Sequence, residues 1–381
     1  EGLKQVAISQ NINMIIVGPE EPLVKGIFDF FANDPATSEI NVIGPSAAAA
    51  QLEGSKAFSK HFMQRHQIPT AGYAEFTIEN YEEGKSYIAA HSLPIVLKAD
   101  GLAAGKGVII ASTHQEALDC FESMLQHKQF GSASARVVIE EFLTGEEASF
   151  IVMVDGTHAL AFASSQDHKA RDDGDKGPNT GGMGAYSPAP VVTPAVHDWV
   201  MQNVIYPTVK GMASEGHVYT GFLYAGLMVS PDGTCKVLEF NCRFGDPETQ
   251  PIMMRLQSDL VELCQAAVEG KLAQQEIKFD SRAAVGVVLA AGGYPDDYRK
   301  GDVISGLPAE DSREAKVFHA GTVLKDGQVL TAGGRVLCAT ALGANVTAAQ
   351  KAAYELTDKV QWDGVFSRRD IGYRAIKREN S

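Results

Sequence analysis

The feature that most constrains the fold and function of this chain is a glycine-rich basic loop between two apolar runs. Residues 96 to 110 read VLKADGLAAGKGVII. The loop is not a P-loop, because Gly101 and Gly105 are one residue too close and no Ser or Thr follows Lys106. Its flanks, VLKA and GVII, are typical of strands, so the loop joins two strands. Glycines let such a loop lie flat over phosphates and donate N–H groups, while Lys98 on the first strand adds a fixed charge. The alternative is an ordinary turn with solvated lysines.

The charge of the chain argues against several classes of partner. Its 381 residues carry a formal net charge of −14, so we expect no general affinity for nucleic acid or for an anionic membrane. No apolar run approaches the ~20 residues that span a bilayer, and the first residues lack the pattern of a signal peptide. The five cysteines form no C-x-x-C pair, so no zinc site or disulfide framework is indicated. We therefore expect a globular protein of the reducing cytoplasm.

The N-terminal segment has the pattern of a parallel α/β unit. An apolar run at 14–17 breaks at Gly-Pro, a helical pattern follows over 23–31, and a second apolar run at 40–46 ends in another Gly-Pro. Ligands of such units bind beyond the carboxyl ends of the strands. Glu20 follows the first strand and is therefore a candidate binding residue. The alternative is a surface acid near the start of a helix.

The rest of the chain is expected to form two further domains. A helical stretch at 51–66 carries Lys56 and Lys60 four residues apart, and short strands then alternate with helices. Residues 172–188 are too rich in glycine for a helix or a regular strand, so we expect a long polar loop there. The pattern indicates a small β-rich domain at 281–381. The family resemblance described below implies the other bounds, which are 1–52 and 53–280, with a lid subdomain at about 73–142.

The segment VLEFNCRFGDPE places two oxygen ligands on one side of a strand. Side chains alternate along a strand, so Glu239 and Asn241 face one side while Leu238 and Phe240 face the other. A carboxylate and an amide oxygen suit magnesium, which prefers hard oxygen donors and substrate phosphates. Arg243 continues the same face and could stabilise charge on a phosphoryl or acyl-phosphate group. A solvent-facing strand edge is the alternative.

The segment IEEFLTGEEASF indicates a different kind of site. The end of an apolar strand, at Glu140, Glu141 and Leu143, supplies backbone donors and acceptors for an adenine edge. An acid a few residues further along can accept hydrogen bonds from ribose hydroxyls, and Glu147 is the residue chosen for this role. Acid-rich strand ends are common, so this signal is weak when taken alone.

In their order along the chain, these segments resemble the ATP-grasp superfamily, in which a nucleotide is clasped between two α/β subdomains. Further segments are similar to the phosphoribosylamine–glycine ligase family: GPEEPLVKG, QLEGSKAF, LKADGLAAGKGV, SSQDHK, GPNTGGMGAYSP, EFNCRFGDPETQ, AAGGYP, HAGT, GGRVL and RRDIGYRA. They extend from Gly18 to Ala375 and so cover nearly the whole chain. The resemblance implies a multidomain protein of mixed α/β and α+β class. Its ATP-grasp fold would have a partial N-terminal parallel α/β domain and a small β-rich C-terminal domain.

The resemblance implies an ATP-dependent carbon–nitrogen ligase of purine biosynthesis. Such an enzyme joins glycine to 5-phosphoribosylamine through a glycyl phosphate and releases ADP and phosphate. Lys56 and Lys98 would hold the phosphates of ATP, together with the glycine-rich loop and its Lys106. Glu239 and Asn241 would hold Mg²⁺ or Mn²⁺. Arg243 and Lys98 would act on the reacting groups, so the expected partners are ATP, glycine and phosphoribosylamine, with no nucleic acid and no membrane.

The sugar phosphate needs a site of its own. Arg368 and Arg369 are adjacent cations in an acidic chain, and the planar fork of arginine binds phosphate with two donors. We expect at least one of them to hold the phosphate of phosphoribosylamine, with Glu20 at the ribose hydroxyls across a domain junction. The alternative is a solvated pair on a surface turn. Asp175, beside GPNTGGMG, is a weaker candidate for the glycine ammonium group.

Two features depart from the family pattern. The family usually opens with a strand and a glycine-rich turn, and this chain begins after them. Many ATP-grasp enzymes also carry a metal-binding acid on the strand before the E-x-N segment, whereas FLYAGLMV has none. The metal would then depend on Glu239, Asn241 and phosphate oxygens. A rival function is a nucleotide-sensing module that binds ATP without forming product, although the intact Glu239, Asn241 and Arg243 favour the ligase.

Overall fold

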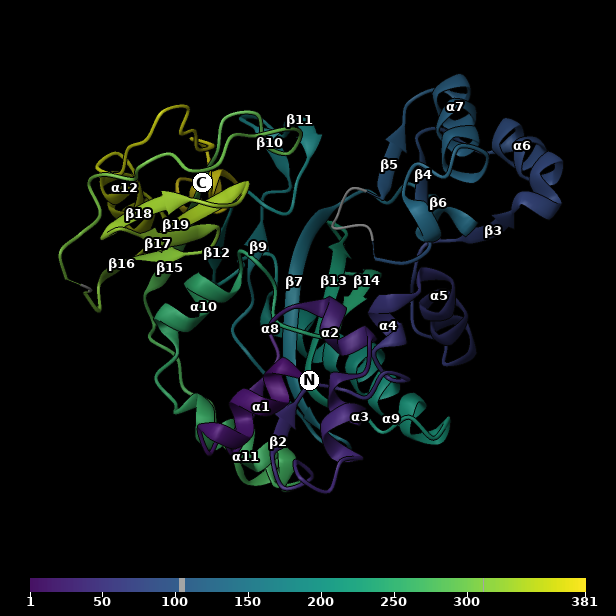
Figure 1. Cartoon of the computed structure of the whole chain (residues 1–381). Coiled ribbons are helices and arrows are strands. Elements are labelled where there is room, and N and C mark those ends of the chain that lie inside the picture. Colours follow the sequence, from purple (N-terminus) through teal and green to yellow (C-terminus); the bar gives the residue numbers. More distant parts are fainter. Residues whose placement is uncertain (103–106, 311) are drawn as a thin grey trace. The chain divides into compact units, whose positions relative to one another are not determined.

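The computed structural model describes residues 1–102, 107–310 and 312–381. These residues form two units, each assembled from separate stretches of the chain (Figure 1). Unit 1 comprises residues 1–161, 192–244 and 260–276, and unit 2 comprises residues 162–191, 245–259 and 277–381. Within the described ranges, no helix is long and apolar enough to cross a membrane.

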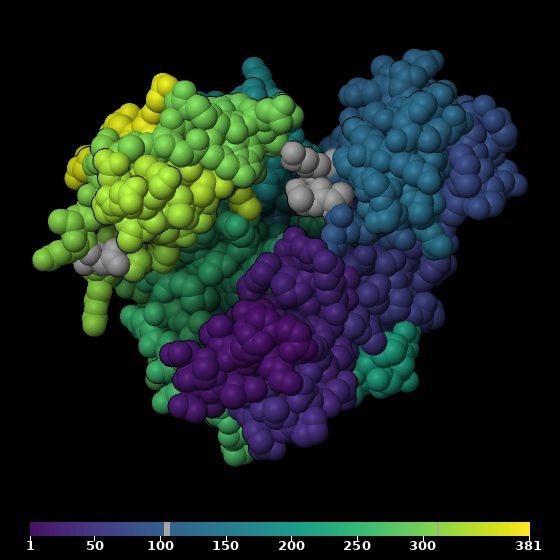
Figure 2. Space-filling view, viewed as in Figure 1, coloured from purple at the N-terminus to yellow at the C-terminus, as the bar shows by residue number. Residues whose placement is uncertain are grey.

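The N-terminal part of unit 1 is a parallel strand–helix–strand unit, as predicted. β1 (Met14–Ile16) pairs in parallel with β2 (Asn41–Ile43). The helix predicted over 23–31 is instead two helices, α2 (Glu20–Val24) and α3 (Ile27–Ala32). Gly26 separates them with a φ of +84°, a conformation that strains other residues. The preceding helix, α1 (Gly2–Ser9), lies at the surface of the unit (Figure 2).

Two helices replace the single helix predicted over 51–66. α4 (Gln51–Gly54) ends where the backbone becomes extended at Ser55, and α5 (Lys56–Arg65) begins at the next residue. The Ser55 side chain caps α5 and also donates to the Asp100 carboxylate at 3.0 Å. This cap ties the first turn of α5, and with it Lys56, to the segment that follows Lys98.

A four-stranded antiparallel sheet occupies residues 73–141. Its strands, in spatial order, are β3 (Tyr73–Thr77), β6 (Arg136–Glu141), β4 (Ile95–Ala99) and β5 (Val108–Ala111). The helices α6 (Tyr81–Ala90) and α7 (His114–Leu125) pack against this sheet, where Phe121 meets Phe76 edge to face. β4 and β5 pair directly, which confirms that the glycine-rich loop joins two neighbouring strands.

A second antiparallel sheet lies at the centre of unit 1 (Figure 1). Its strands, in spatial order, are β14 (Cys235–Asn241), β13 (Thr220–Val229), β7 (Glu146–Asp155) and β8 (Ala159–Ala161). The ladder between β13 and β14 contains a β-bulge. Gly226 pairs with Glu239 and Leu227 pairs with Val237, so Leu238 is the extra residue on β14.

Unit 1 also contains the helical segment predicted near 196–216, but its winding changes midway. α8 (Pro194–Val200) leads into a π-helical turn (Met201–Ile205) and then α9 (Tyr206–Ser214). Pro207 accounts for the change, because it has no N–H for the carbonyl one turn earlier and its ring crowds that carbonyl. The remaining helix, α11 (Leu260–Val268), packs against β7 and β13.

A five-stranded antiparallel sheet forms the core of unit 2. Its strands, in spatial order, are β16 (Ala315–His319), β19 (Arg335–Gly343), β15 (Ala283–Ala290), β12 (Gly184–Ser187) and β9 (Gln166–Asp167). The helices of the unit are α10 (Thr249–Arg255), α12 (Val346–Thr357) and α13 (Tyr373–Glu379). The predicted Lys-Asp-Gly turn joins the hairpin of β17 (Thr322–Lys325) and β18 (Gln328–Thr331).

The prediction of a plain loop over 172–188 is wrong. β10 (Ala170–Asp172) pairs with β11 (Lys176–Asn179), and β12 lies inside the five-stranded sheet. Gly184 shows why the glycine content misled. A Cβ atom there would lie 2.6 Å from the Gly286 carbonyl oxygen and 2.8 Å from Ile371. The glycine therefore permits close packing within a strand and does not signal a flexible segment.

Candidate active site

Two lysines predicted to hold phosphate lie in unit 1. Lys98, on β4, is buried, and its Nζ atom donates to the Leu238 carbonyl oxygen at 3.0 Å. Lys56, at the start of α5, donates to the carbonyl oxygen of Gly101 at 2.8 Å. Burial lowers the pKa of Lys56, and the nearby charge of Glu239 partly offsets this. The structure thus brings the two lysines, the start of the glycine-rich loop and β14 together.

The predicted metal ligands lie on one face of β14, but the alternation differs from the prediction. Leu238 is the bulged residue, so regular alternation begins at Glu239, and Phe240 is buried on the opposite face. The hydrogen-bond network orients the Asn241 amide, whose nitrogen donates to Glu53 Oε1 at 3.0 Å and to the Phe240 carbonyl at 3.1 Å. The amide oxygen of Asn241 is then the atom that can serve as a metal ligand.

Glu53, on α4, belongs to this site although the sequence reasoning missed it. Its buried carboxylate accepts from the Cys242 N–H at 2.7 Å and pairs with Arg243 Nη2 at 3.1 Å. Burial raises the pKa of Glu53 to about 7, against the opposing effects of Arg243 and the Cys242 N–H. A signal was present in the sequence, since Glu53 stands three residues before Lys56 in QLEGSKAF. An acid within a helical pattern, however, predicts no chemistry.

Arg243 lies between two carboxylates. Besides its contact with Glu53, its Nε atom lies 3.3 Å from Glu20 Oε2. Its Nη1 atom donates to the Phe244 carbonyl at 3.1 Å. Sequence reasoning selected Glu20 and Arg243 for separate reasons, and the structure places them side by side. Their roles toward substrates stay predictions.

The predicted adenine region lies where β6 ends at Glu141. The Glu141 N–H donates to the Gly72 carbonyl at 3.0 Å, and its carboxylate accepts from Lys236 Nζ at 2.6 Å. The hydrogen bond from Lys236 lowers the pKa of Glu141. Leu143 lies just beyond the end of the strand, where backbone groups leave the ladder. Glu147, the predicted ribose ligand, is an exposed residue of β7.

The two arginines predicted to bind the sugar phosphate differ in their surroundings within unit 2. The Arg368 side chain is 0% exposed, donates to Asp175 Oδ1 at 2.6 Å and also pairs with Asp370. The Arg369 side chain is 48% exposed and pairs with Asp358 at 2.8 Å. Arg369 is therefore accessible to a ligand, whereas Arg368 is enclosed by protein.

Asp175, the predicted partner of the glycine ammonium group, belongs to an ion cluster. Its carboxylate accepts from Arg368, Tyr373 and Arg374. His168 lies buried beside this cluster, and its Nε2 atom accepts from the Gly372 N–H at 3.2 Å. Burial, together with the nearby Arg368 and Arg374 charges, lowers the pKa of His168 to about 3, so its imidazole stays neutral.

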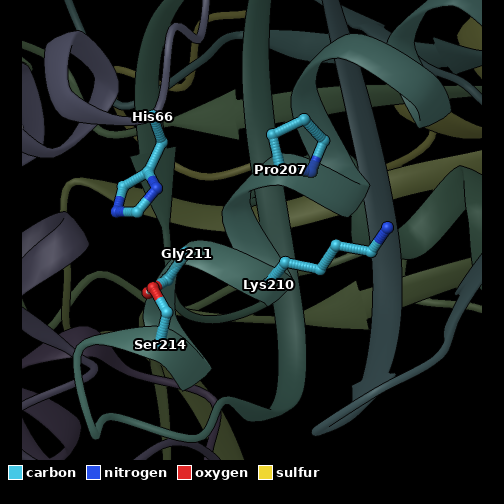
Figure 3. A pocket seen from close by; sticks show the side chains of 5 residues that line it. All are labelled: His66, Pro207, Lys210, Gly211 and Ser214. Carbon is cyan, nitrogen blue, oxygen red and sulfur yellow. The ribbon is translucent and has the colours of Figure 1, made fainter.

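Other parts of the prediction fall elsewhere. Gly105 and Lys106 lie outside the described residues. A surface hollow of about 290 Å³ between α5 and α9 has none of the described residues predicted for the site in its lining (Figure 3). The residues that line it are His66, Pro207, Lys210, Gly211 and Ser214. Across the described ranges, no group of three or more His, Cys, Asp or Glu residues is arranged to hold a metal.

Three family domains match the chain in sequence order. They are the phosphoribosylglycinamide synthetase N domain at residues 1–53, the ATP-grasp (A) domain at 54–249 and the C domain at 284–374. The chain is 64% identical over 378 residues to a phosphoribosylamine–glycine ligase of Vibrio cholerae serotype O1, covering 99% of this chain and 87% of that relative. It is 60% identical over 380 residues to that of Escherichia coli O157:H7, covering 100% and 87%.

Solved structures agree with these sequence matches. A crystal structure of phosphoribosylamine–glycine ligase from Thermotoga maritima aligns with a TM-score of 0.80 at 39% identity, over 87% of this chain and 82% of that chain. The biotin carboxylase domain of Hydrogenobacter thermophilus 2-oxoglutarate carboxylase aligns with a TM-score of 0.73 at 18% identity, over 96% and 78%. The second likeness concerns the fold alone. Together the comparisons confirm the predicted multidomain ATP-grasp fold.

Proposed function

The chain belongs to the phosphoribosylglycinamide synthetase family, and from this premise we propose how its residues carry out the reaction of a phosphoribosylamine–glycine ligase. This ATP-dependent ligase of purine biosynthesis joins glycine to 5-phosphoribosylamine. One observation carries the proposed roles: Glu239, Asn241 and Arg243 occupy alternate positions of one segment, and Glu53 contacts both Asn241 and Arg243 in it.

The reaction consists of two displacements. A carboxylate oxygen of glycine attacks the γ-phosphorus of ATP, the bond to the bridging oxygen of ADP breaks, and glycyl phosphate forms. The amine of phosphoribosylamine then attacks the glycyl carbonyl carbon, phosphate leaves with the electron pair of the broken C–O bond, and the amine loses a proton. The first step brings two anions together, so fixed cations are needed to offset their repulsion.

Arg243 is proposed to bind the glycine carboxylate and then the acyl phosphate. Glu53 fixes its Nη2 atom at 3.1 Å from the protein side, while Glu20 lies at the longer distance of 3.3 Å from Nε. The contact with Glu20 is the one that an incoming anion would replace. Glu20 would then be released to accept from the ribose hydroxyls of phosphoribosylamine.

Lys98 and Lys56 are proposed to hold the phosphates of ATP. Lys98 stands on a strand and is held by the Leu238 carbonyl, so it presents a positioned charge. Lys56 donates a hydrogen bond of 2.8 Å to the carbonyl oxygen of Gly101, so the start of the glycine-rich loop lies beside Lys56. Backbone groups at the end of β6, from Glu140 to Leu143, are proposed to bind adenine. Glu147 is proposed to accept from the nucleotide ribose.

Glu239 and Asn241 fit a hard divalent cation such as Mg²⁺ or Mn²⁺. One supplies a carboxylate and the other an amide oxygen from the same face of β14, which is the donor chemistry that these ions prefer. When bound, such an ion supplies charge neutralisation for the transferring phosphoryl group. The protein contributes the orientation of the Asn241 ligand, since its amide is held by Glu53.

Arg369 is the proposed ligand for the sugar phosphate in unit 2. It is accessible, and its guanidinium also stacks over the Tyr354 ring at 4.4 Å from the centroid, which fixes its plane. Arg368, in contrast, is proposed to support this region through Asp175 and Asp370. The role of Asp175 toward the glycine ammonium group stays a weaker prediction, because three side chains already donate to its carboxylate.

A steady-state assay of ADP release tests the proposal. We expect release to require both glycine and phosphoribosylamine, and glycinamide ribonucleotide to form in equal amount. ATP binding without substrate-dependent ADP release would favour the nucleotide-sensing module instead. The residue roles are tested separately by the variants described in the Discussion.

A further inference from the structure

Three buried charged side chains form a linked group in unit 1, here called the Lys60–Glu140–Lys98 triad. Glu140 Oε2 lies 3.1 Å from Lys60 Nζ, and Glu140 Oε1 lies 3.0 Å from Lys98 Nζ. The side chains of Lys60, Glu140 and Lys98 are 3%, 2% and 7% exposed. Because each carboxylate oxygen faces a different ammonium group, Glu140 links the two lysines.

Lys60 is anchored from several sides. Its Nζ atom donates to Thr70 Oγ1 at 2.8 Å, and the Thr70 hydroxyl donates to the Val237 carbonyl at 2.7 Å. The same ammonium group lies 5.7 Å from the centroid of the Tyr73 ring. Lys60 therefore stands at the junction of α5, β3 and β14. None of the roles assigned above uses it.

The charges of the triad do not balance. Two ammonium groups and one carboxylate carry a net charge of +1 in a place that solvent barely reaches. Excess buried charge is costly, so this arrangement is not the most stable way to fill the space. Without Lys60, Glu140 would neutralise Lys98 alone. With Lys60 present, the carboxylate is shared, and Lys98 keeps more of its attraction for an anion.

We propose that Lys60 is a positioning residue for nucleotide binding, which acts through Glu140 to fix the Lys98 ammonium group and to preserve its charge for the phosphates of ATP. The inference rests on the proposed role of Lys98 as a phosphate ligand. It adds a residue that lies behind the site and touches neither nucleotide nor metal ligand in the proposed arrangement.

The titration of Lys60 gives this role a signature. Burial lowers the pKa of Lys60 to about 8, and the Lys98 charge acts in the same direction, while Glu140 and Glu141 oppose both. The Tyr73 ring, whose side chain is also titratable, faces the same ammonium group. Below pH 8 the ammonium form supports ATP binding. Above pH 8 the proton is lost, and affinity for ATP should fall.

The test compares ATP binding by calorimetry in Lys60→Met, Lys60→Arg and a matched control, Lys210→Met. Lys210 is an exposed lysine of α9 outside the site (Figure 3). Lys60→Met should weaken ATP binding about tenfold or more, the scale of one lost charge-assisted contact. The KM values for glycine and phosphoribosylamine should change less. Lys60→Arg should restore most of the affinity, and Lys210→Met should bind like the wild type.

The pH profile separates this role from a merely structural one. ATP affinity of the wild type should decline between pH 7 and pH 9, and the decline should be clearly smaller in Lys60→Arg, whose side chain keeps its proton. Lys56, whose pKa burial also lowers, accounts for any decline that remains. Unchanged ATP affinity in Lys60→Met, or the same pH profile in wild type and Lys60→Arg, would overturn the inference. The comparison with Lys60→Arg decides the matter even if Lys60→Met does not fold.

Two further variants separate this inference from the function that it rests on. If Lys98→Met binds ATP like the wild type, the assigned role of Lys98 fails and the inference fails with it. If Lys98→Met loses affinity while Lys60→Met does not, only the inference fails. The double variant Lys60→Met with Glu140→Gln should regain part of the affinity lost in Lys60→Met, because the net charge beside the nucleotide returns to +1. No recovery would contradict the charge argument.

Discussion

The Arg243 guanidinium lies 3.1 Å from the carboxylate of Glu53, a residue that is distant in sequence. The same carboxylate accepts from the Cys242 N–H and from the Asn241 amide. One acidic side chain therefore holds three consecutive residues at the end of β14. This relationship makes Glu53 the support on which the proposed metal ligand Asn241 and the proposed substrate arginine both depend.

Replacing Glu53 with Gln should lower kcat by roughly ten- to a hundredfold, because a charge-assisted contact to an arginine contributes about 1.5–3 kcal/mol. The KM for glycine should rise as well, since Arg243 loses its fixed orientation. Steady-state kinetics with varied glycine would measure both. A suitable control is Glu215→Gln, which breaks an ion pair with Arg65 of 2.9 Å outside the site. Wild-type kcat in Glu53→Gln would refute this support role.

The variants Glu239→Gln and Asn241→Leu should both depress turnover strongly, because each removes an oxygen ligand of the proposed cation. Titration of activity with Mg²⁺ should show that Glu239→Gln needs a higher concentration of the ion for half-maximal rate. If either variant turns over at nearly the wild-type rate at modest Mg²⁺ concentrations, the proposed metal ligands are wrong.

Lys98→Met should weaken ATP binding by roughly ten- to a hundredfold and slow phosphoryl transfer, because the buried ammonium group is the proposed ligand of the phosphates. Calorimetry would measure the affinity, and a single-turnover experiment would measure the transfer. If the ATP affinity of this variant equals that of the wild type, Lys98 is not a ligand of the ATP phosphates.

Arg369→Ala should affect substrate binding, whereas Arg368→Ala should affect stability. Loss of the exposed Arg369 should raise the KM for phosphoribosylamine by roughly ten- to a hundredfold and leave unfolding nearly unchanged. Loss of the enclosed Arg368 should lower the free energy of unfolding by about 3 kcal/mol, because Asp175 and Asp370 lose their partner. Urea unfolding and kinetics on both variants would show the difference. An effect of Arg369→Ala on ATP instead would contradict the phosphate assignment.

His168 should make the folded state sensitive to acid. Its pKa is about 3 when folded and about 6.5 when unfolded, so the unfolded chain binds one more proton between these values. The free energy of unfolding should therefore fall by up to ~1.4 kcal/mol per pH unit as the pH drops from 6.5 toward 3. His168→Gln, which can still accept from the Gly372 N–H, should lack this contribution. Parallel slopes in urea unfolding of the two proteins would disprove the effect.

Local pattern was enough to predict several parts of the fold and site. The alternation along β14 placed Glu239 and Asn241 on one face, and the apolar flanks of the glycine-rich loop predicted the pairing of β4 with β5. Both features depend on a few neighbouring residues, so a short window of sequence contains the information. The parallel pairing of β1 with β2 was predicted in the same way.

Features that depend on distant contacts were missed. Glu53 reads as an ordinary helical acid, and its role arises from β14, which is far away in the chain. The glycines of 172–188 suggested a loop because the strands that pack against Gly184 cannot be inferred from that segment alone. Similarly, nothing adjacent in sequence distinguishes the enclosed Arg368 from the accessible Arg369.

The bulge at Leu238 determines which sequence changes β14 can accept. Its carbonyl oxygen is the acceptor for Lys98, at 3.0 Å from Nζ. The strand that carries the proposed cation ligands and the lysine proposed for the nucleotide are thus aligned through a main-chain atom. Substitutions of the Leu238 side chain leave this alignment in place, whereas deletion of a single residue from β14 would remove the extra residue and with it the acceptor. At position 238, the proposed site therefore depends on the presence of the extra residue in β14 and not on the identity of its side chain.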